Sequence, residues 1–264
     1  MSDWLAAILL GIVEGITEYL PVSSTGHLIL ASELLGYDAQ RWALFNVAIQ
    51  PGAILAIVVL YWKTFWEVLT GLIARDGKAI AFVRNILLAF VPAVALGLLF
   101  SDAIDVLLEN AVVVAWALII GGIAILLVER WAKPQPVDGV AAVSAKQSLM
   151  VGLVQCLAMV PGVSRSGATI LGAMSFGVDR KTAAEFSFFL AVPTLTGATA
   201  LQLAKHGSAM TQGDLGLIGI GFIVSFIVAL VVVKAFVGFV TRYGFAPFAW
   251  YRIIAGIAAL VWLG

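Results

Sequence analysis

The sequence predicts an all-α integral membrane protein with six transmembrane helices and two re-entrant helical hairpins in two inverted-topology repeats. The chain has 264 residues, of which 62% are hydrophobic and 11% are charged, and its mean hydropathy is +1.08. About a quarter of the residues are charged in an average soluble domain, so this composition indicates a lipid environment. A duplicated, interrupted apolar segment and the placement of the basic residues predict the rest of the architecture.

The overall composition also excludes several classes of function. The net charge is zero, which argues against binding of nucleic acid driven by bulk charge. Cys156 is the single cysteine, so an internal disulfide and a multi-cysteine metal site are excluded, and we interpret it as a packing residue. Residues 1–20 lack the basic segment and the small-residue cleavage site of a signal peptide, so we do not interpret them as one.

Six segments are long and apolar enough to cross a bilayer, which takes about 20 residues. They lie near residues 42–61, 85–101, 111–129, 182–204, 215–238 and 246–263.

Two further pairs of apolar segments are too short to span. Segments 4–20 and 24–36 are separated by Pro21 and a Ser-Ser-Thr-Gly turn, and segments 145–160 and 165–178 are separated in the same way. Irregular backbone at membrane depth is tolerated only where protein or a wet cavity surrounds it. We therefore expect two re-entrant hairpins.

The basic residues predict the orientation of the spans by the positive-inside rule. The regions expected in the cytoplasm contain Lys63, Arg75, Lys78, Arg84, Arg130, Lys133, Lys146, Arg180, Lys181, Lys234 and Arg242. The opposite side contains Asp102, Asp105, Glu109 and Asp214, with Arg41 and Lys205. Both termini are then expected outside.

Each hairpin is followed by three spans, an odd number, so the second half should have the inverse topology of the first. The proposed halves are 1–140 and 141–264, joined by a linker over 133–139. We expect them to interlock as a single membrane domain over residues 1–264, because lipid alone could not bury either hairpin.

The first hairpin contains two acids, Glu14 and Glu18, one helical turn apart and on the same face. Carboxylates within a membrane are rare and usually functional. The alternative is a structural ion pair with Arg165 or Arg252. Three hydroxyl residues and a glycine then precede a new helix. Hydroxyls and free N–H groups at a helix N-terminus can bind an anion, although capping of the helix alone would also explain these residues. These residues are Ser23, Ser24, Thr25 and Gly26.

The second hairpin carries an arginine, Arg165, in the corresponding turn. A guanidinium at membrane depth suits a bidentate grip on phosphate oxygens, or an ion pair with Glu14 or Glu18. If both turns point inward, two helix N-termini converge on one anion. Small and hydroxyl residues surround the arginine: Ser164, Ser166, Gly167 and Thr169.

Other polar residues in apolar segments have two interpretations each. His27 lies about one turn past Ser24 and could act as a base or form a structural hydrogen bond. Gln50, before Pro51, could reach substrate, although a helix kink also explains the pair. Glu185 and Arg252 are expected to form an ion pair between helices.

Two stretches, Glu14–His27 and Pro161–Thr169, resemble the signature motifs of the undecaprenyl-diphosphatase family, the bacitracin-resistance type of membrane phosphatase. The similarity extends to residues 184–193 and to the Tyr251-Arg252 pair. The resemblance implies hydrolysis of undecaprenyl diphosphate to undecaprenyl phosphate and phosphate. This reaction recycles a lipid carrier for peptidoglycan synthesis and confers bacitracin resistance. A multi-pass location in the bacterial inner membrane is also implied, with a site open to the periplasmic face.

By position, the resemblance makes Glu14 and Glu18 the acidic pair, Ser24 the nucleophile and Arg165 the phosphate-binding residue. His27 and the flanking Ser, Thr and Gly residues match further motif positions. The partners implied are a polyprenyl diphosphate lipid and the bilayer. We expect a phosphoseryl intermediate. The alternative is direct attack by water, which the two acids, or a Mg²⁺ or Ca²⁺ ion that they bind, would position. The rival function is a transporter or lipid flippase, because such proteins also contain inverted repeats with broken helices; a structural scaffold does not explain the polar cluster.

Overall fold

The computed structural model describes residues 2–36, 39–100, 110–207 and 212–263. Within these ranges the regular structure is helical, and the only β-type pairing is an isolated bridge between Gln135 and Val178. The all-α fold predicted from the sequence is thereby confirmed.

Six helices are long and apolar enough to cross a membrane, as predicted. They are α3 (Ala39–Leu60), α5 (Gly77–Leu99), α7 (Ala111–Trp131), α10 (Arg180–His206), α11 (Gln212–Tyr243) and α12 (Ala246–Leu263). Helix α11 is longer than the segment expected from the sequence, which ended at residue 238.

One helix was not anticipated in the region between the first two spans. Helix α4 (Trp62–Ile73) follows α3 almost directly, and a short turn leads to α5, whose first turn is capped by the Asp76 side chain. The exposed apolar residues of α4 recur at helical spacing, with Trp62, Trp66 and Ile73 on its outer side. The segment is too short to register as a span, which is why hydropathy alone missed it.

Both interrupted segments form helix–turn–helix pairs. The first consists of α1 (Asp3–Thr17) and α2 (Ser24–Leu34). The second consists of α8 (Ala145–Gln155), a 3₁₀ turn η2 (Cys156–Met159) and α9 (Arg165–Ser175), preceded by the 3₁₀ turn η1 (Val140–Ala142). At about 1.5 Å per residue, none of these helices reaches across a bilayer. Their lengths are compatible with re-entrant hairpins.

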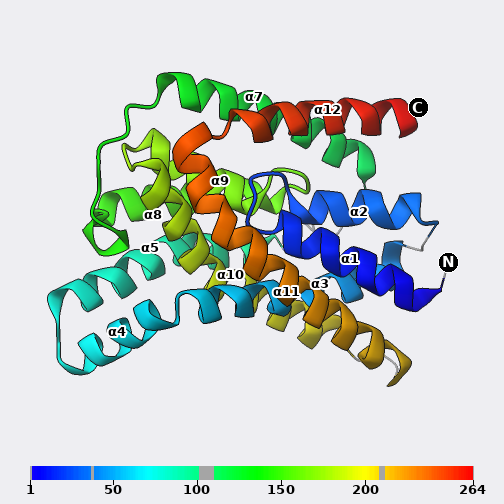
Figure 1. Cartoon of the computed structure of the whole chain (residues 1–264), viewed down its shortest axis with the longest axis horizontal. Helices are drawn as coiled ribbons and strands as arrows, with labels where there is room; N and C mark the ends of the chain where they lie inside the picture. The colour runs from blue at the N-terminus through cyan, green and yellow to red at the C-terminus, as the bar shows by residue number, and fades with distance from the viewer. Residues whose placement is uncertain (1, 37–38, 101–109, 208–211, 264) are drawn as a thin grey trace.

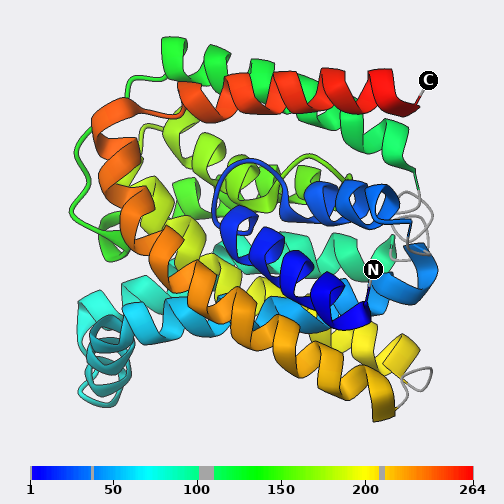
Figure 2. The ribbon, with the colours of Figure 1, turned by 45° about the vertical axis from the view of Figure 1, so that its right-hand side comes forward.

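The packing of the two hairpins follows one pattern. Helix α1 lies against α11 of the second half, and α8 lies against α5 of the first half (Figures 1 and 2). Gly11 allows the first contact, because a Cβ there would lie 2.8 Å from the carbonyl oxygen of Gly221. Gly152, 141 residues later, allows the second, because its Cβ would lie 2.5 Å from the Ala89 carbonyl oxygen. This exchange of partners is compatible with inverted repeats.

Both chain ends lie on the side of the molecule away from the turn between α4 and α5 (Figure 1). That arrangement is compatible with the orientation predicted from the basic residues. Asp102, Asp105 and Glu109, expected on the outer side, lie outside the described residues, as does the side chain of Arg41.

Candidate active site

The first turn of the site connects α1 to α2. Ser23, just before α2, has a φ of 74°, and its Oγ accepts a hydrogen bond from the Gly26 N–H at 3.3 Å. A non-glycine residue rarely adopts this left-handed conformation, which costs about 1–3 kcal/mol and is most common at functional sites. The strained turn makes Ser24 the first residue of α2 and buries its hydroxyl.

The second turn repeats this geometry. Ser164 has a φ of 73°, and its Oγ accepts from the Gly167 N–H at 3.0 Å. Arg165, the first residue of α9, therefore occupies the position that Ser24 occupies in α2. The Ser166 hydroxyl donates to the Leu20 carbonyl at 2.8 Å, which joins the two turns directly.

Two glycines lie at tightly packed positions of the turns. A Cβ at Gly26 would lie 3.0 Å from a Val114 methyl carbon and 3.4 Å from the Cα of Gly162. A Cβ at Gly167 would crowd Ser164, whose Cβ and Oγ would each be 3.2 Å away. Gly26 therefore lets the first turn approach the second, whereas Gly167 avoids crowding within its own turn.

Glu18 joins the central groups of the two halves. The Ser24 hydroxyl donates to Glu18 Oε2, and Arg165 Nη2 donates to Glu18 Oε1 at 2.7 Å. This carboxylate is 4% exposed, so little water competes for its two oxygens. An acid that accepts a hydrogen bond from a serine hydroxyl, beside a guanidinium, is an arrangement that could support nucleophilic attack on an anionic substrate.

Arg165 is held on several sides. Its Nη1 donates to the carbonyl oxygen of Ser187 at 3.0 Å and to the Ser187 hydroxyl at 3.2 Å. Its guanidinium lies over the ring of Tyr19, 5.6 Å from the centroid, and the Tyr19 hydroxyl is anchored on the Ala53 carbonyl. The Nε of Arg165 is buried and has no hydrogen-bond partner among the described residues.

Glu14 lies one turn before Glu18 and is 0% exposed. Among the described residues, neither of its carboxylate oxygens has a hydrogen-bond partner. It touches neither the Ser24 hydroxyl nor Arg165 through a hydrogen bond, so the two predicted acids occupy different positions in the site. Glu14 interacts electrostatically with Glu18 and Arg165, and an acid buried beside another acid at membrane depth is costly without a function.

The hydroxyls of α9 form a network behind Arg165. The Ser164 and Ser166 oxygens are 3.1 Å apart, and Thr169 Oγ1 donates to the Ser187 hydroxyl at 2.7 Å. Ser187 thus receives hydrogen bonds from both Arg165 and Thr169. These residues support the arginine more than they line open space.

His27 lies beside the cluster with both ring nitrogens engaged elsewhere. Its Nδ1 is 2.8 Å from the Ser23 carbonyl oxygen, and its Nε2 is 2.7 Å from the Tyr251 hydroxyl. Since only an N–H can bond a carbonyl, a neutral ring carries its proton on Nδ1 and accepts from Tyr251. The structure therefore does not bring a free ring nitrogen of His27 to Ser24.

Two other predicted residues are not part of the hydrogen-bonded cluster. Thr25 is half-buried in the first turn of α2, and Gln50 is half-buried in α3. Neither forms a hydrogen bond to the cluster among the described residues.

The expected ion pair between Glu185 and Arg252 is wrong. The Arg252 guanidinium donates to backbone carbonyls, including those of Pro21 and Gly162. Glu185 lies instead near Lys181, one turn earlier on α10. The sequence suggested a salt bridge because both residues are charged and apolar surroundings flank them; it could not reveal that irregular turns would supply carbonyl acceptors.

Sequence reasoning also missed Ser187, Tyr19 and Tyr251 as parts of the site. Ser187 lies within the 184–193 stretch and Tyr251 within the Tyr-Arg pair that both carried the family resemblance, and Tyr19 lies inside the first motif. Their motif positions were the only available signal, because serine and tyrosine in apolar helices are otherwise unremarkable packing residues.

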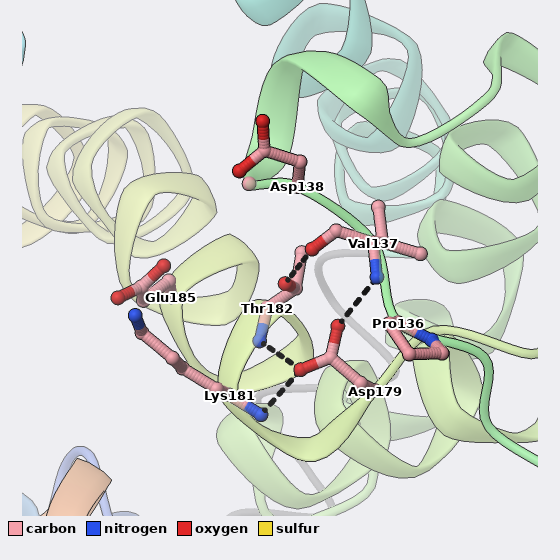
Figure 3. A pocket seen from close by; sticks show the side chains of 8 residues that line it. Pro136, Val137, Asp138, Asp179, Lys181, Thr182 and Glu185 are labelled. Carbon is pink, nitrogen blue, oxygen red and sulfur yellow. Dashed lines mark hydrogen bonds between the residues drawn. The ribbon is translucent and has the colours of Figure 1, made fainter.

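A hollow of about 510 Å³ lies apart from this cluster, between the linker and the start of α10 (Figure 3). Asp179 caps α10 there and accepts from the N–H groups of Lys181, Thr182 and Val137. None of the predicted site residues lines it. Ser24, Glu18 and Arg165 lie instead in the buried cluster described above.

Comparison with known proteins identifies the family of this chain. The family model described as bacitracin resistance protein BacA matches residues 7–258. The undecaprenyl-diphosphatase of Novosphingobium aromaticivorans is 59% identical, with 100% of this chain and 99% of that protein covered. The undecaprenyl-diphosphatase of Sphingopyxis alaskensis is 57% identical, also over 100% of this chain and 99% of its own length. With a fold of six apolar helices and both motifs gathered at one buried cluster, this chain belongs to the BacA family of bacitracin resistance proteins.

Proposed function

We propose that this chain hydrolyses undecaprenyl diphosphate to undecaprenyl phosphate and inorganic phosphate. The observation that carries the proposal is the Glu18 carboxylate, which joins the Ser24 hydroxyl to the Arg165 guanidinium at the meeting point of two helix N-termini. The names of its relatives supply the substrate. By the same reasoning the reaction recycles the lipid carrier for peptidoglycan synthesis and confers resistance to bacitracin.

The substrate fits the surroundings of the cluster. Its polyprenyl tail belongs in lipid, and its diphosphate needs a dry pocket with positive charge and many donors. Arg165 and the N-termini of α2 and α9 offer both, since the N-terminus of a helix carries a partial positive charge and unpaired N–H groups. Phosphoryl transfer depends mainly on positioning and on stabilising charge.

In the proposed first step, the Ser24 oxygen attacks the terminal phosphorus while Glu18 takes the hydroxyl proton. The bond between that phosphorus and the bridging oxygen breaks, and undecaprenyl phosphate leaves with its negative charge stabilised by Arg165. Glu18 then passes its proton to the leaving phosphate. A water molecule then attacks the phosphorus of the phosphoserine and gives its proton to Glu18. The bond between the phosphorus and the Ser24 oxygen breaks, and Glu18 returns the proton to that oxygen as phosphate is released.

Glu14 and Glu18 are the residues that would hold a divalent cation in this site. Mg²⁺ and Ca²⁺ prefer carboxylate oxygens, and both Glu14 oxygens lack a hydrogen-bond partner among the described residues. No group of three Asp, Glu, His or Cys residues gathers in the part of the chain that the structure describes. Such an ion, when bound, would neutralise charge on the diphosphate.

We place the protein in the bacterial inner membrane with the site open to the periplasmic face. The six apolar helices support a multi-pass arrangement. The direction of opening rests on the distribution of basic residues, which puts both termini outside.

The direct test is release of inorganic phosphate from undecaprenyl diphosphate by the purified protein in detergent. We expect stoichiometric release of one phosphate and one undecaprenyl phosphate per substrate, and none from a Ser24→Ala preparation of equal purity. A protein that binds or moves the lipid across vesicles without releasing phosphate would instead be a transporter.

A further inference from the structure

Arg252 on α12 makes an unusual set of contacts for a buried charge. It is 1% exposed, and among the described residues no carboxylate forms an ion pair with it. Its three nitrogens donate instead to five backbone carbonyl oxygens: Leu118 (3.3 Å), Pro21 (3.0 Å), Val163 (3.1 Å), Ala117 (3.0 Å) and Gly162 (2.8 Å).

The five carbonyls belong to three separate parts of the chain. Ala117 and Leu118 lie on α7, Pro21 lies in the first strained turn, and Gly162 and Val163 lie in the second. Pro21 precedes Ser23 by two residues and Gly162 precedes Ser164 by two residues, so the guanidinium contacts the same position in both turns. One side chain thus holds the irregular backbone of both halves against a common helix.

This contact set suits arginine alone. Carbonyls in a turn have no partner within a helix, and in a lipid environment water cannot replace one. Arginine presents five N–H donors in a rigid planar fork, whereas lysine presents three donors at a single point and methionine none. Only the guanidinium can satisfy acceptors on three separated segments at once.

The consequence concerns the two reacting groups. Ser24 and Arg165 each follow one of the strained serines, and each begins the helix that its turn introduces. The distance between them therefore depends on how the two turns are held relative to each other. We propose that Arg252 is a positioning residue, which sets the spacing between Ser24 and Arg165 by holding both turns; this inference rests on the function proposed above.

The packing around Arg252 provides a second way to disturb it. A Cβ on Gly121 would collide with Nη2 and Cζ of the guanidinium. The variant Gly121→Ala therefore displaces Arg252 without removing any polar group. Arg242→Met is the matched control, since Arg242 is exposed at the end of α11 and contacts the ring of its neighbour Tyr243.

The first measurement is the kinetics of phosphate release from undecaprenyl diphosphate, with kcat counted per folded molecule. A misplacement of about 1 Å can reduce a rate by about 10²-fold, so we expect Arg252→Met to lower kcat by about that factor with little change in KM. Arg252→Lys and Gly121→Ala should fall between this variant and the wild type, and Arg242→Met should match the wild type. A kcat per folded molecule within about threefold of wild type in all three site variants would overturn the proposal. If Arg252→Met does not fold, Arg252→Lys and Gly121→Ala decide.

The second measurement does not depend on activity. Hydrogen exchange followed by mass spectrometry should show faster exchange in peptides that contain the Gly26 and Gly167 amides, because both turns loosen together in Arg252→Lys and Gly121→Ala. Unchanged exchange in both peptides would overturn the positioning role. If the wild-type protein releases no phosphate, yet both turns loosen together in the variants, the proposed function is refuted and Arg252 remains the residue that joins the turns.

Discussion

Replacing each of the two buried acids by its amide tests which one acts on Ser24. Glu18→Gln and Glu14→Gln are the same chemical change, four residues apart on one helix face. Glu18 accepts from the Ser24 hydroxyl and from Arg165, whereas Glu14 has no hydrogen-bond partner among the described residues. We therefore expect unequal effects on catalysis.

The magnitude for Glu18→Gln follows from what the amide cannot do. It cannot take the serine proton, and loss of a general base typically costs about 10²–10⁴-fold in rate. At about 1.36 kcal/mol per factor of ten, this corresponds to about 2.7–5.4 kcal/mol of barrier. The variant also loses the ion pair with Arg165, so its thermal midpoint should fall. Glu14→Gln should cost about tenfold or less, or about 1.4 kcal/mol, because Glu14 forms no hydrogen bond to Ser24 or Arg165.

The assay is phosphate release by purified variants at saturating substrate, with thermal unfolding and size-exclusion profiles as folding controls. The result that refutes the reasoning is a Glu14→Gln loss equal to or greater than that of Glu18→Gln in folded protein. That outcome would assign the base, or a cation ligand, to Glu14 and would favour direct attack by water over attack by Ser24.

Four further predictions follow from the same contacts. Ser24→Ala should abolish turnover if the serine is the nucleophile, with a phosphoserine trapped in the wild type by mass spectrometry; loss of a mere donor would cost only about 10²–10³-fold. Arg165→Lys should lower kcat/KM by about 10- to 160-fold, because one charged hydrogen bond contributes about 1.5–3 kcal/mol, while near-normal turnover would make Arg165 a structural counter-ion. Cysteines introduced at Lys78 and Asp214, with Cys156 replaced, should be labelled from opposite sides of the membrane, and labelling from the same side would contradict the inverted repeats. Burial raises the pKa of Asp179, but hydrogen bonds from Thr182, Val137 and Lys181 outweigh burial and hold the pKa below its ordinary value of 3.8. The ionised Asp179 therefore stabilises the fold at neutral pH, and this stabilisation is lost as the pH falls through the lowered pKa. Asp179→Ala should cost about 0.5–2 kcal/mol at pH 7, and a difference in thermal midpoint between variant and wild type that does not narrow on acidification would exclude this role.

Hydropathy predicted the six spans because a helix that crosses lipid must be apolar along most of its length, and this apolarity is visible in the amino-acid composition. The same reasoning missed α4, since Trp62–Ile73 is shorter than a span and its exposed apolar side chains resemble those of an interfacial loop. It also placed the end of α11 near residue 238 rather than at Tyr243. Boundaries depend on local packing, whereas the existence of a span depends on average apolarity.

The site divides in the same way. The residue types of Ser24, Glu18 and Arg165 are informative in sequence because charged groups and hydroxyl clusters at membrane depth are costly without a function. The hydrogen bonds that connect them were not predictable, because they join helices from the two halves of the chain. Which acid reaches the serine follows from the turn geometry at Ser23, whose left-handed φ no propensity rule would assign to serine.

Arg252 shows why the remaining part of the site needed a structure. An arginine in an apolar helix is expected to pair with an acid, and Glu185 was the acid available. The two interrupted hairpins instead create carbonyl groups that no helix can satisfy, and a single guanidinium from α12 satisfies them from both halves. The strain at Ser23 and Ser164 and the burial of Arg252 are thus parts of one arrangement. Each turn places the first residue of the following helix in the site, and Arg252, which contacts both turns, fixes the spacing between Ser24 and Arg165.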